Sequence, residues 1–103
     1  MEARLKIVRS NWNGAILVCA KCSKKIDGGF GPKGKTGLAK ALRKYLGLKL
    51  NRKARAGVVE VKCLGVCPKN AVTVVDMAAP NGWLIVPAGA GLDDVAAELG
   101  QPA

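Results

Sequence analysis

The residues best suited to chemistry are the four cysteines, which form two closely spaced pairs. Cys19 and Cys22 have the spacing C-x-x-C, and Cys63 and Cys67 have the spacing C-x-x-x-C. A thiolate metal site needs sulfurs a few ångströms apart, and each pair of cysteines within one turn delivers two of its ligands. The spacing therefore predicts a single metal or redox site composed of Cys19, Cys22, Cys63 and Cys67.

The compartment decides which chemistry paired cysteines favour. The segment Met1 to Trp12 is charged and lacks the apolar core of a signal peptide, and no stretch approaches the length of a membrane span. We therefore expect a cytoplasmic protein with no membrane partner. In that reducing setting, two close pairs of cysteines indicate metal binding or redox chemistry before structural disulfides.

Two predicted strands carry the pairs. Ala15–Val18 is a short apolar run that stops at Cys19, and Val58–Val61 is a second run that ends just before Cys63. A helix between them implies a right-handed parallel crossover, which puts the carboxyl ends of both strands on one edge of the sheet. Cys19 and Cys63 are therefore expected at the same edge.

The connecting segment is predicted to be a loop followed by a helix. Residues Ala20–Lys35 are rich in glycine and are expected to form a loop, and Thr36 offers a helix N-cap. The helix ends at Gly47 in a left-handed cap. Its apolar stripe consists of Leu38, Ala41, Leu42, Tyr45 and Leu46.

The second half of the chain is predicted to contain a hairpin and a closing helix. Val72–Val75 and Trp83–Val86 are strand-like runs joined by turn residues, with Trp83 used for packing. Asp93 and Asp94 complement the positive end of the last helix, which stops at Gly100. Its apolar stripe consists of Leu92, Val95, Ala96 and Leu99.

These elements give an α/β (α+β) fold with a mixed four-stranded sheet and two main helices, in the order β-α-β-β-β-α. With 103 residues, half of them apolar, the chain forms one small globular domain. We expect an N-terminal arm or edge strand over residues 1–13, the domain over 14–100 and a tail over 101–103.

Charge is unevenly distributed along the chain, whose formal net charge is +10. Between Lys21 and Arg55 lie twelve Lys or Arg residues against one acid, Asp27, whereas no basic residue follows Ala71. Such a basic face attracts an acidic protein partner, an anionic cofactor or nucleic acid. Near the cysteines, lysines would stabilise an anionic cluster but would favour ligation of any cation, so they do not select the metal. They are Lys21, Lys24, Lys25, Lys62 and Lys69.

The cysteine pattern in its strand context resembles that of the thioredoxin-like [2Fe-2S] ferredoxins. The resemblance covers Gly14 to Gly100, and its most specific part is Cys63-Leu64-Gly65-Val66-Cys67. It implies a thioredoxin-like fold, a [2Fe-2S] cluster on Cys19, Cys22, Cys63 and Cys67, and a role as electron carrier that docks an acidic redox partner. Many members of this family are homodimers, which the resemblance extends to this chain as an expectation.

Zinc is the alternative metal, and a zinc-stapled basic module would bind nucleic acid or another protein. Its phosphate contacts would be Arg43, Lys44, Arg52, Lys53 and Arg55. Aromatic residues for base stacking are few, and Tyr45 lies on the apolar stripe of the helix, which predicts a place in the core.

Two enzyme classes are also considered. A thiol–disulfide oxidoreductase uses C-x-x-C after a first strand, but the predicted loop separates Cys22 from the helix, and Cys63 and Cys67 are left without a role. Residues 29–36 match the P-loop pattern for nucleotides, although residues 19–28 separate them from the strand. A less specific alternative is that Lys33 and Lys35 hold a phosphate or a partner's carboxylate at the start of this helix. The chain has no histidine, which favours a carrier over a catalyst.

Overall fold

The computed structural model describes residues 5–66 and 68–100. Four strands form one mixed sheet in the order β2-β1-β3-β4, and three helices accompany them within the described residues. The predicted mixed four-stranded sheet of an α+β domain is thus confirmed. The elements in chain order are β1 (Ala15–Cys19), α1 (Ala20–Lys25), α2 (Leu38–Leu46), β2 (Gly57–Val61), β3 (Ala71–Asp76), β4 (Leu84–Pro87) and α3 (Leu92–Glu98).

The sheet is built around β1, which has a strand on each side. β1 runs parallel to β2, and their register places Cys19 opposite Val61. On its other side β1 is antiparallel to β3, which in turn forms an antiparallel hairpin with β4. The predicted parallel crossover and hairpin are therefore both present, and the carboxyl ends of β1 and β2 lie at one edge of the sheet.

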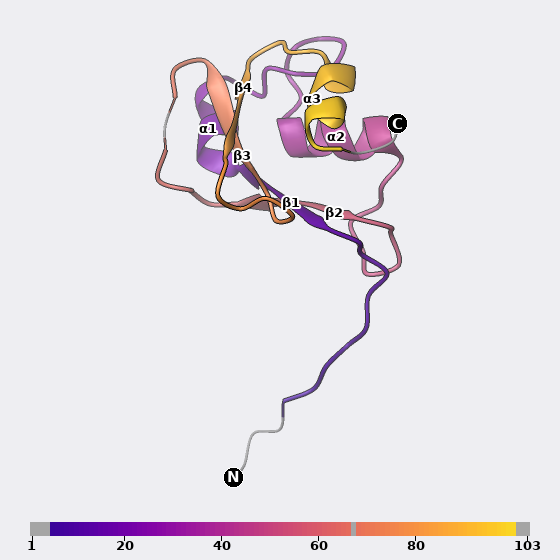
Figure 1. Ribbon diagram of the computed structural model, residues 1–103. Helices are drawn as coiled ribbons and strands as arrows, with labels where there is room; N and C mark the ends of the chain where they lie inside the picture. Colours follow the sequence, from indigo (N-terminus) through magenta and orange to yellow (C-terminus); the bar gives the residue numbers. More distant parts are fainter. Residues whose placement is uncertain (1–4, 67, 101–103) are drawn as a thin grey trace.

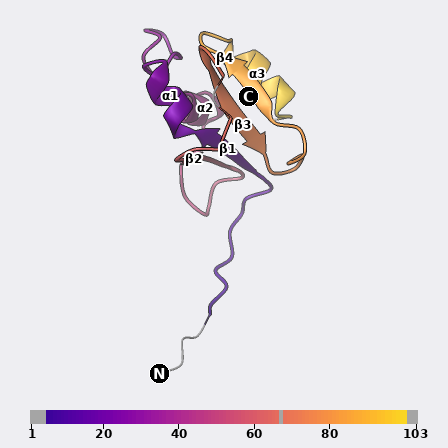
Figure 2. The same cartoon turned by 90° about the vertical axis from the view of Figure 1, so that its left-hand side faces the viewer.

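The helices lie on both sides of this sheet. α2 and α3 pack together on one face, whereas α1 lies on the opposite side, as two perpendicular views show (Figures 1 and 2). The core between the sheet and the α2–α3 pair consists of aliphatic side chains, each of which stabilises the fold by about 1.5–3 kcal/mol when fully buried. It includes Ile16, Val18, Leu38, Leu42, Val58, Val72, Val74, Val86, Val95 and Leu99.

Three local predictions were wrong. The first turn of the segment predicted as a loop is helix α1, so the fold has three helices in place of two main ones. The N-cap of α2 is Gly37, because Thr36 is held in a bridge with Phe30, whose N–H donates to the Thr36 carbonyl at 3.0 Å. The stripe residues Leu38 and Leu42 are buried, but Tyr45 is 39% exposed, so it does not take the place in the core that its position on the stripe predicts.

The remaining boundaries lie close to the predicted ones. β4 begins at Leu84, and Trp83 just before it is 43% exposed, so the packing role expected for this ring is only partly met. α2 ends at Gly47, whose φ of 67° is the left-handed cap that was predicted. α3 carries Asp93 and Asp94 in its first turn, as expected for acids at a helix N-terminus.

The N-terminal segment is an arm whose root is fixed to the domain and which projects away from it (Figure 1). Residues 5–10 have no regular structure and no strand partner, so the alternative of an edge strand is not observed for them. The N–H of Asn11 donates to the Arg52 carbonyl and that of Asn13 to the Arg55 carbonyl, both at 2.7 Å. The Trp12 ring then lies against Gly57, where a side chain would overlap it.

Among the described residues, none of the helices combines the length and the apolar character that crossing a bilayer requires.

Replacing Gly57 with alanine should destabilise the fold by about 1–3 kcal/mol, because the new methyl group would collide with the Trp12 ring and force it off the strand. The free energy of unfolding from urea denaturation measures this loss. Gly14→Ala is the matched control, since nothing lies within 4 Å of a Cβ there. Equal stability of the two variants would contradict the close packing of Trp12 on β2.

Candidate thiol site

Cys19 and Cys22 form a buried pair where β1 turns into α1. Cys19 is the last residue of β1 and the N-cap of α1, and Cys22 lies one turn later in the helix. Their exposed fractions are 0% and 2%. The Ser23 hydroxyl donates to the Cys19 carbonyl at 3.1 Å, which ties the helix to the end of the strand. The two sulfurs are therefore within reach of each other, and they interact directly.

The segment 62–66, which follows β2, lies against this pair. The Lys21 N–H donates to the Lys62 carbonyl at 3.2 Å, so the start of α1 is bound to the end of β2. The Leu64 N–H lies close enough to the Cys19 sulfur to lower its pKa, and the Cys22 thiol donates to the Val66 carbonyl at 3.6 Å. Both sulfurs of the first pair thus contact the backbone that carries the second pair.

Thr73 links this segment to the sheet. Its hydroxyl is fully buried and donates to the Val66 carbonyl at 3.0 Å, and the Cys22 sulfur lies 4.0 Å from the Thr73 hydroxyl oxygen. Sequence reasoning did not single out this residue. The signal was a lone hydroxyl in the otherwise apolar run Val72–Val75, where a buried polar group needs a partner.

Cys63 takes a different position from the first pair. Its side chain is exposed, and its sulfur accepts a hydrogen bond from the Gly65 N–H at 3.3 Å. The φ of Gly65 is 86°, a conformation that favours glycine and that turns this N–H back toward the sulfur. Cys67, the fourth predicted ligand, lies outside the described residues.

The four predicted site residues are thus only partly brought together. Cys19 and Cys22 are adjacent, but within residues 5–66 and 68–100 no three Cys, Asp, Glu or His side chains converge closely enough to hold a metal ion. The edge of the sheet was predicted correctly, since the segment carrying Cys63 contacts the first pair. The five lysines near the cysteines in sequence are all exposed. They are Lys21, Lys24, Lys25, Lys62 and Lys69.

The pKa values of the two buried thiols are shifted in opposite directions. Burial raises the pKa of Cys19, but the N–H groups of Cys22, Leu64 and Lys21 and the Cys22 thiol together outweigh it, so the pKa is lowered. Burial also raises the pKa of Cys22; the Thr73 backbone and hydroxyl lower it, but the neighbouring Cys19 raises it again, so the net shift is upward. Cys19 is therefore the more acidic thiol of the pair.

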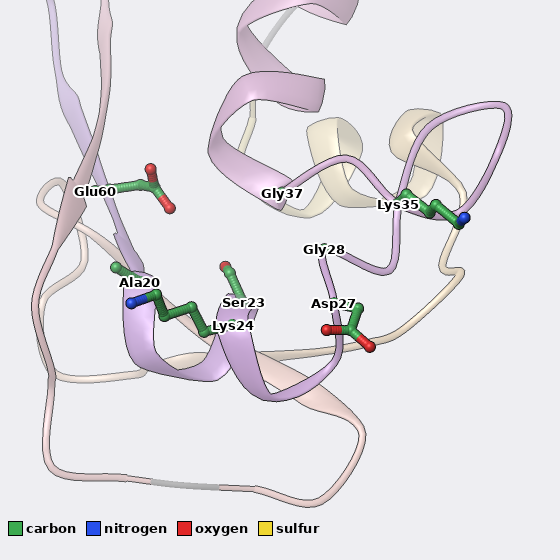
Figure 3. A pocket seen from close by; sticks show the side chains of 8 residues that line it. All are labelled: Ala20, Ser23, Lys24, Asp27, Gly28, Lys35, Gly37 and Glu60. Carbon is green, nitrogen blue, oxygen red and sulfur yellow. The ribbon is translucent and has the colours of Figure 1, made fainter.

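The glycine- and lysine-rich segment forms a compact turn instead of a nucleotide loop. Residues 30–36 close on themselves through the Phe30–Thr36 bridge, and α1 separates them from β1. A cavity of about 480 Å³ lies between this turn, α1 and β2. Figure 3 shows Ser23 and Glu60 directed into it, with Lys35 extending away. The lining combines the acids Asp27 and Glu60 with Lys24 and Lys35, so the cavity does not favour the alternative of an anion held by Lys33 and Lys35.

Comparison with protein-family models, with curated proteins and with solved structures found no match for this chain.

Replacing Thr73 with valine should release the 62–66 segment, because the Val66 carbonyl loses its hydroxyl donor while the shape of the side chain is kept. We expect a loss of about 1–3 kcal/mol in urea denaturation. Alkylation of Cys22 in metal-free, reduced protein should also become faster. Thr73→Ser keeps the hydroxyl and should leave the alkylation rate unchanged, so a similar acceleration in both variants would contradict the role of the hydrogen bond.

The paired thiols should titrate in two separate steps. In metal-free, reduced Cys63→Ser/Cys67→Ser protein, thiolate absorbance in the ultraviolet should rise once below the ordinary cysteine pKa and once above it. Further replacement of Cys22 with serine should remove the upper step and leave one ionisation, that of Cys19. A single unshifted step for both thiols would be inconsistent with the N–H groups around Cys19.

Proposed function

We propose that the chain is a small electron-transfer protein that holds one [2Fe-2S] cluster on Cys19, Cys22, Cys63 and Cys67. The observation that carries this proposal is the contact between the two cysteine-bearing segments. The Leu64 N–H lies close enough to the Cys19 sulfur to lower its pKa, and the Val66 carbonyl accepts a hydrogen bond from the Cys22 thiol. Segments more than forty residues apart in sequence therefore meet at the sulfur atoms.

The donor set fits an iron–sulfur cluster chemically. Thiolates are the preferred ligands of such clusters, and backbone N–H groups directed at sulfur stabilise their negative charge. Leu64 and Gly65 supply two such groups, to Cys19 and to Cys63 respectively. When bound, a [2Fe-2S] cluster accepts and releases a single electron.

The site has one buried side and one exposed side. The burial of Cys19 and Cys22 keeps water from one side of the site, whereas the exposure of Cys63 leaves the other side open to a redox partner. Lys21, Lys24 and Lys25 on α1 and Lys62, next to Cys63 in sequence, are all exposed, and their positive charge favours an acidic partner. Association through such a face would weaken with added salt.

The architecture supports a thioredoxin-like assignment for the fold. The parallel β1–β2 crossover, the β3–β4 hairpin and the closing helix α3 follow the order expected from the resemblance around Cys63 to Cys67. A fold of this kind places the first cysteine pair at the carboxyl end of its central strand.

A thiol–disulfide redox protein is the second candidate, and one specific observation favours it. α1 begins immediately after Cys19, so the predicted loop that argued against this function does not separate the pair from a helix. The lowered pKa of Cys19 beside the raised pKa of Cys22 suits a nucleophilic thiolate with a resolving thiol. This function uses only the first pair, whereas the cluster uses all four cysteines.

Protein purified without oxygen should be coloured and contain iron and sulfide in equal amounts, because four thiolates would retain the cluster. Visible absorption and metal analysis measure this. Cys63→Ser and Cys67→Ser should each abolish the thiolate-to-iron bands. Val66→Ala should retain them, since the exposed side chain is lost but the carbonyl that contacts Cys22 is kept.

The same measurements separate the alternatives. Colourless protein with stoichiometric zinc would contradict the cluster and would indicate the zinc-stapled interaction module instead. Metal-free protein that reduces insulin, and loses this activity in Cys19→Ser but not in Cys63→Ser, would establish the dithiol function and exclude the cluster.

A further inference from the structure

The N-terminal arm exposes an apolar segment that the domain does not cover. Leu5, Ile7 and Val8 are 99%, 96% and 70% exposed, although the rest of the described chain buries most of its large aliphatic side chains. In an extended arm, Leu5, Ile7 and Arg9 share one face, because successive side chains alternate. The segment therefore has one apolar face that ends in a cation.

The direction of this arm is fixed where it leaves the domain. The Asn11 side-chain amide donates to the Lys53 carbonyl at 3.2 Å, and the Trp12 indole N–H donates to the Asn51 carbonyl at 2.7 Å. Together with the backbone bonds of Asn11 and Asn13, these contacts hold the root beside β2, and the arm points away from the sheet (Figures 1 and 2). The root is therefore fixed, while residues 5–10 beyond it are all exposed.

The opposite edge of the sheet offers a matching surface. β4 pairs only with β3, so its outer backbone edge has no strand partner within the described residues. A groove of about 150 Å³ runs between β4 and α3, with Leu84, Val86 and Val95 along its floor. Asp94 and Glu98 stand at its rim. Ile85, which also lines the groove, is 42% exposed.

The charge and the length of the arm match the groove beside β4, which makes the arm of a second copy a suitable occupant. The arm carries Lys6 and Arg9, whereas the part of the chain from Ala71 onward contains acids and no base. Residues 5–10 span roughly 20 Å when extended, which exceeds the length of the four-residue strand β4. If Leu5 and Ile7 enter the groove, Arg9 comes to its acidic rim, which Asp94 and Glu98 form.

We propose that the chain forms a reciprocal dimer in which the arm of each copy adds as a strand to the β4 edge of the other. Main-chain hydrogen bonds pair residues 5–9 with β4, Leu5 and Ile7 fill the groove beside α3, and Arg9 pairs with Asp94 or Glu98. Exchange of identical arms closes the assembly with two equal contacts. This dimer does not depend on the proposed cluster, since neither surface includes a cysteine.

Sedimentation of the protein over a range of concentrations tests the proposal, with a monomer–dimer equilibrium as the expected result. Leu5→Ser/Ile7→Ser should abolish the dimer. Val66→Ser is the matched control, because Val66 is 43% exposed in the segment beside the cysteines, which belongs to neither surface, and it should leave the equilibrium unchanged. A monomer at every concentration, or a dimer that the double variant retains, overturns the proposal.

A charge swap tests the place of docking. Arg9→Glu and Glu98→Arg should each weaken the dimer, on the order of tenfold, and the combined variant should recover the wild-type constant. An arginine near the carboxyl end of α3 is favourable to that helix, so folding is preserved, which circular dichroism checks. Amide hydrogen exchange should show protection of both residues 5–9 and residues 84–86 in the dimer. Protection of the arm without β4, or no recovery in the swap, overturns this docking site.

Discussion

The parallel pairing of β1 with β2 is the constraint on which the rest of the structure depends. Its register sets Cys19 opposite Val61, so the chain that leaves β2 must pass the chain that leaves β1. The Lys21–Lys62 hydrogen bond and the contacts of Leu64 and Val66 with the first cysteine pair follow from that crossing. A shift of one residue in this register would move Ile16 and Val18 out of the core.

Burying two thiols at the crossing sets a second condition, because buried polar atoms need partners. The structure meets it with backbone N–H groups around Cys19 and with the Val66 carbonyl at Cys22. Thr73 then holds that carbonyl from the sheet. The same arrangement serves a metal-bound thiolate and a reactive one, since both need stabilised negative charge on sulfur. The chemistry is therefore distinguished by Cys63 and Cys67, which only the metal site requires.

Much of this could be predicted from sequence because the apolar pattern is strong. Ala15–Val18 and Val58–Val61 have the alternation or apolar density of strands, and each is followed by a cysteine. The sheet, the crossover and the shared edge follow from those two runs. Helix α1 could not be predicted in the same way. Of its six residues only Cys22 is both apolar and buried, so the segment has no helical periodicity of apolar residues.

The contacts around the thiols were also beyond a reading of the sequence. Thr73 meets Val66 only because the 62–66 segment folds back over β3, a tertiary event that no local pattern encodes. Tyr45 was misassigned for a related reason, since periodicity gives the face of a helix but not how far its neighbours extend. Such residues are fixed by the partner elements, whose positions depend on the β1–β2 pairing.

The sheet also separates the two surfaces for which we propose partners. Cys22 and Thr73 meet on the side of α1, whereas Val86 and Val95 line the groove on the side of α3 (Figure 1). Successive side chains of a strand point to opposite faces, so a second copy bound along β4 and α3 fills one face and leaves the other open. If both proposals hold, a redox partner that docks over Cys63 would not compete with the dimer. The proposed self-association and the proposed partner docking would then use different faces of one sheet.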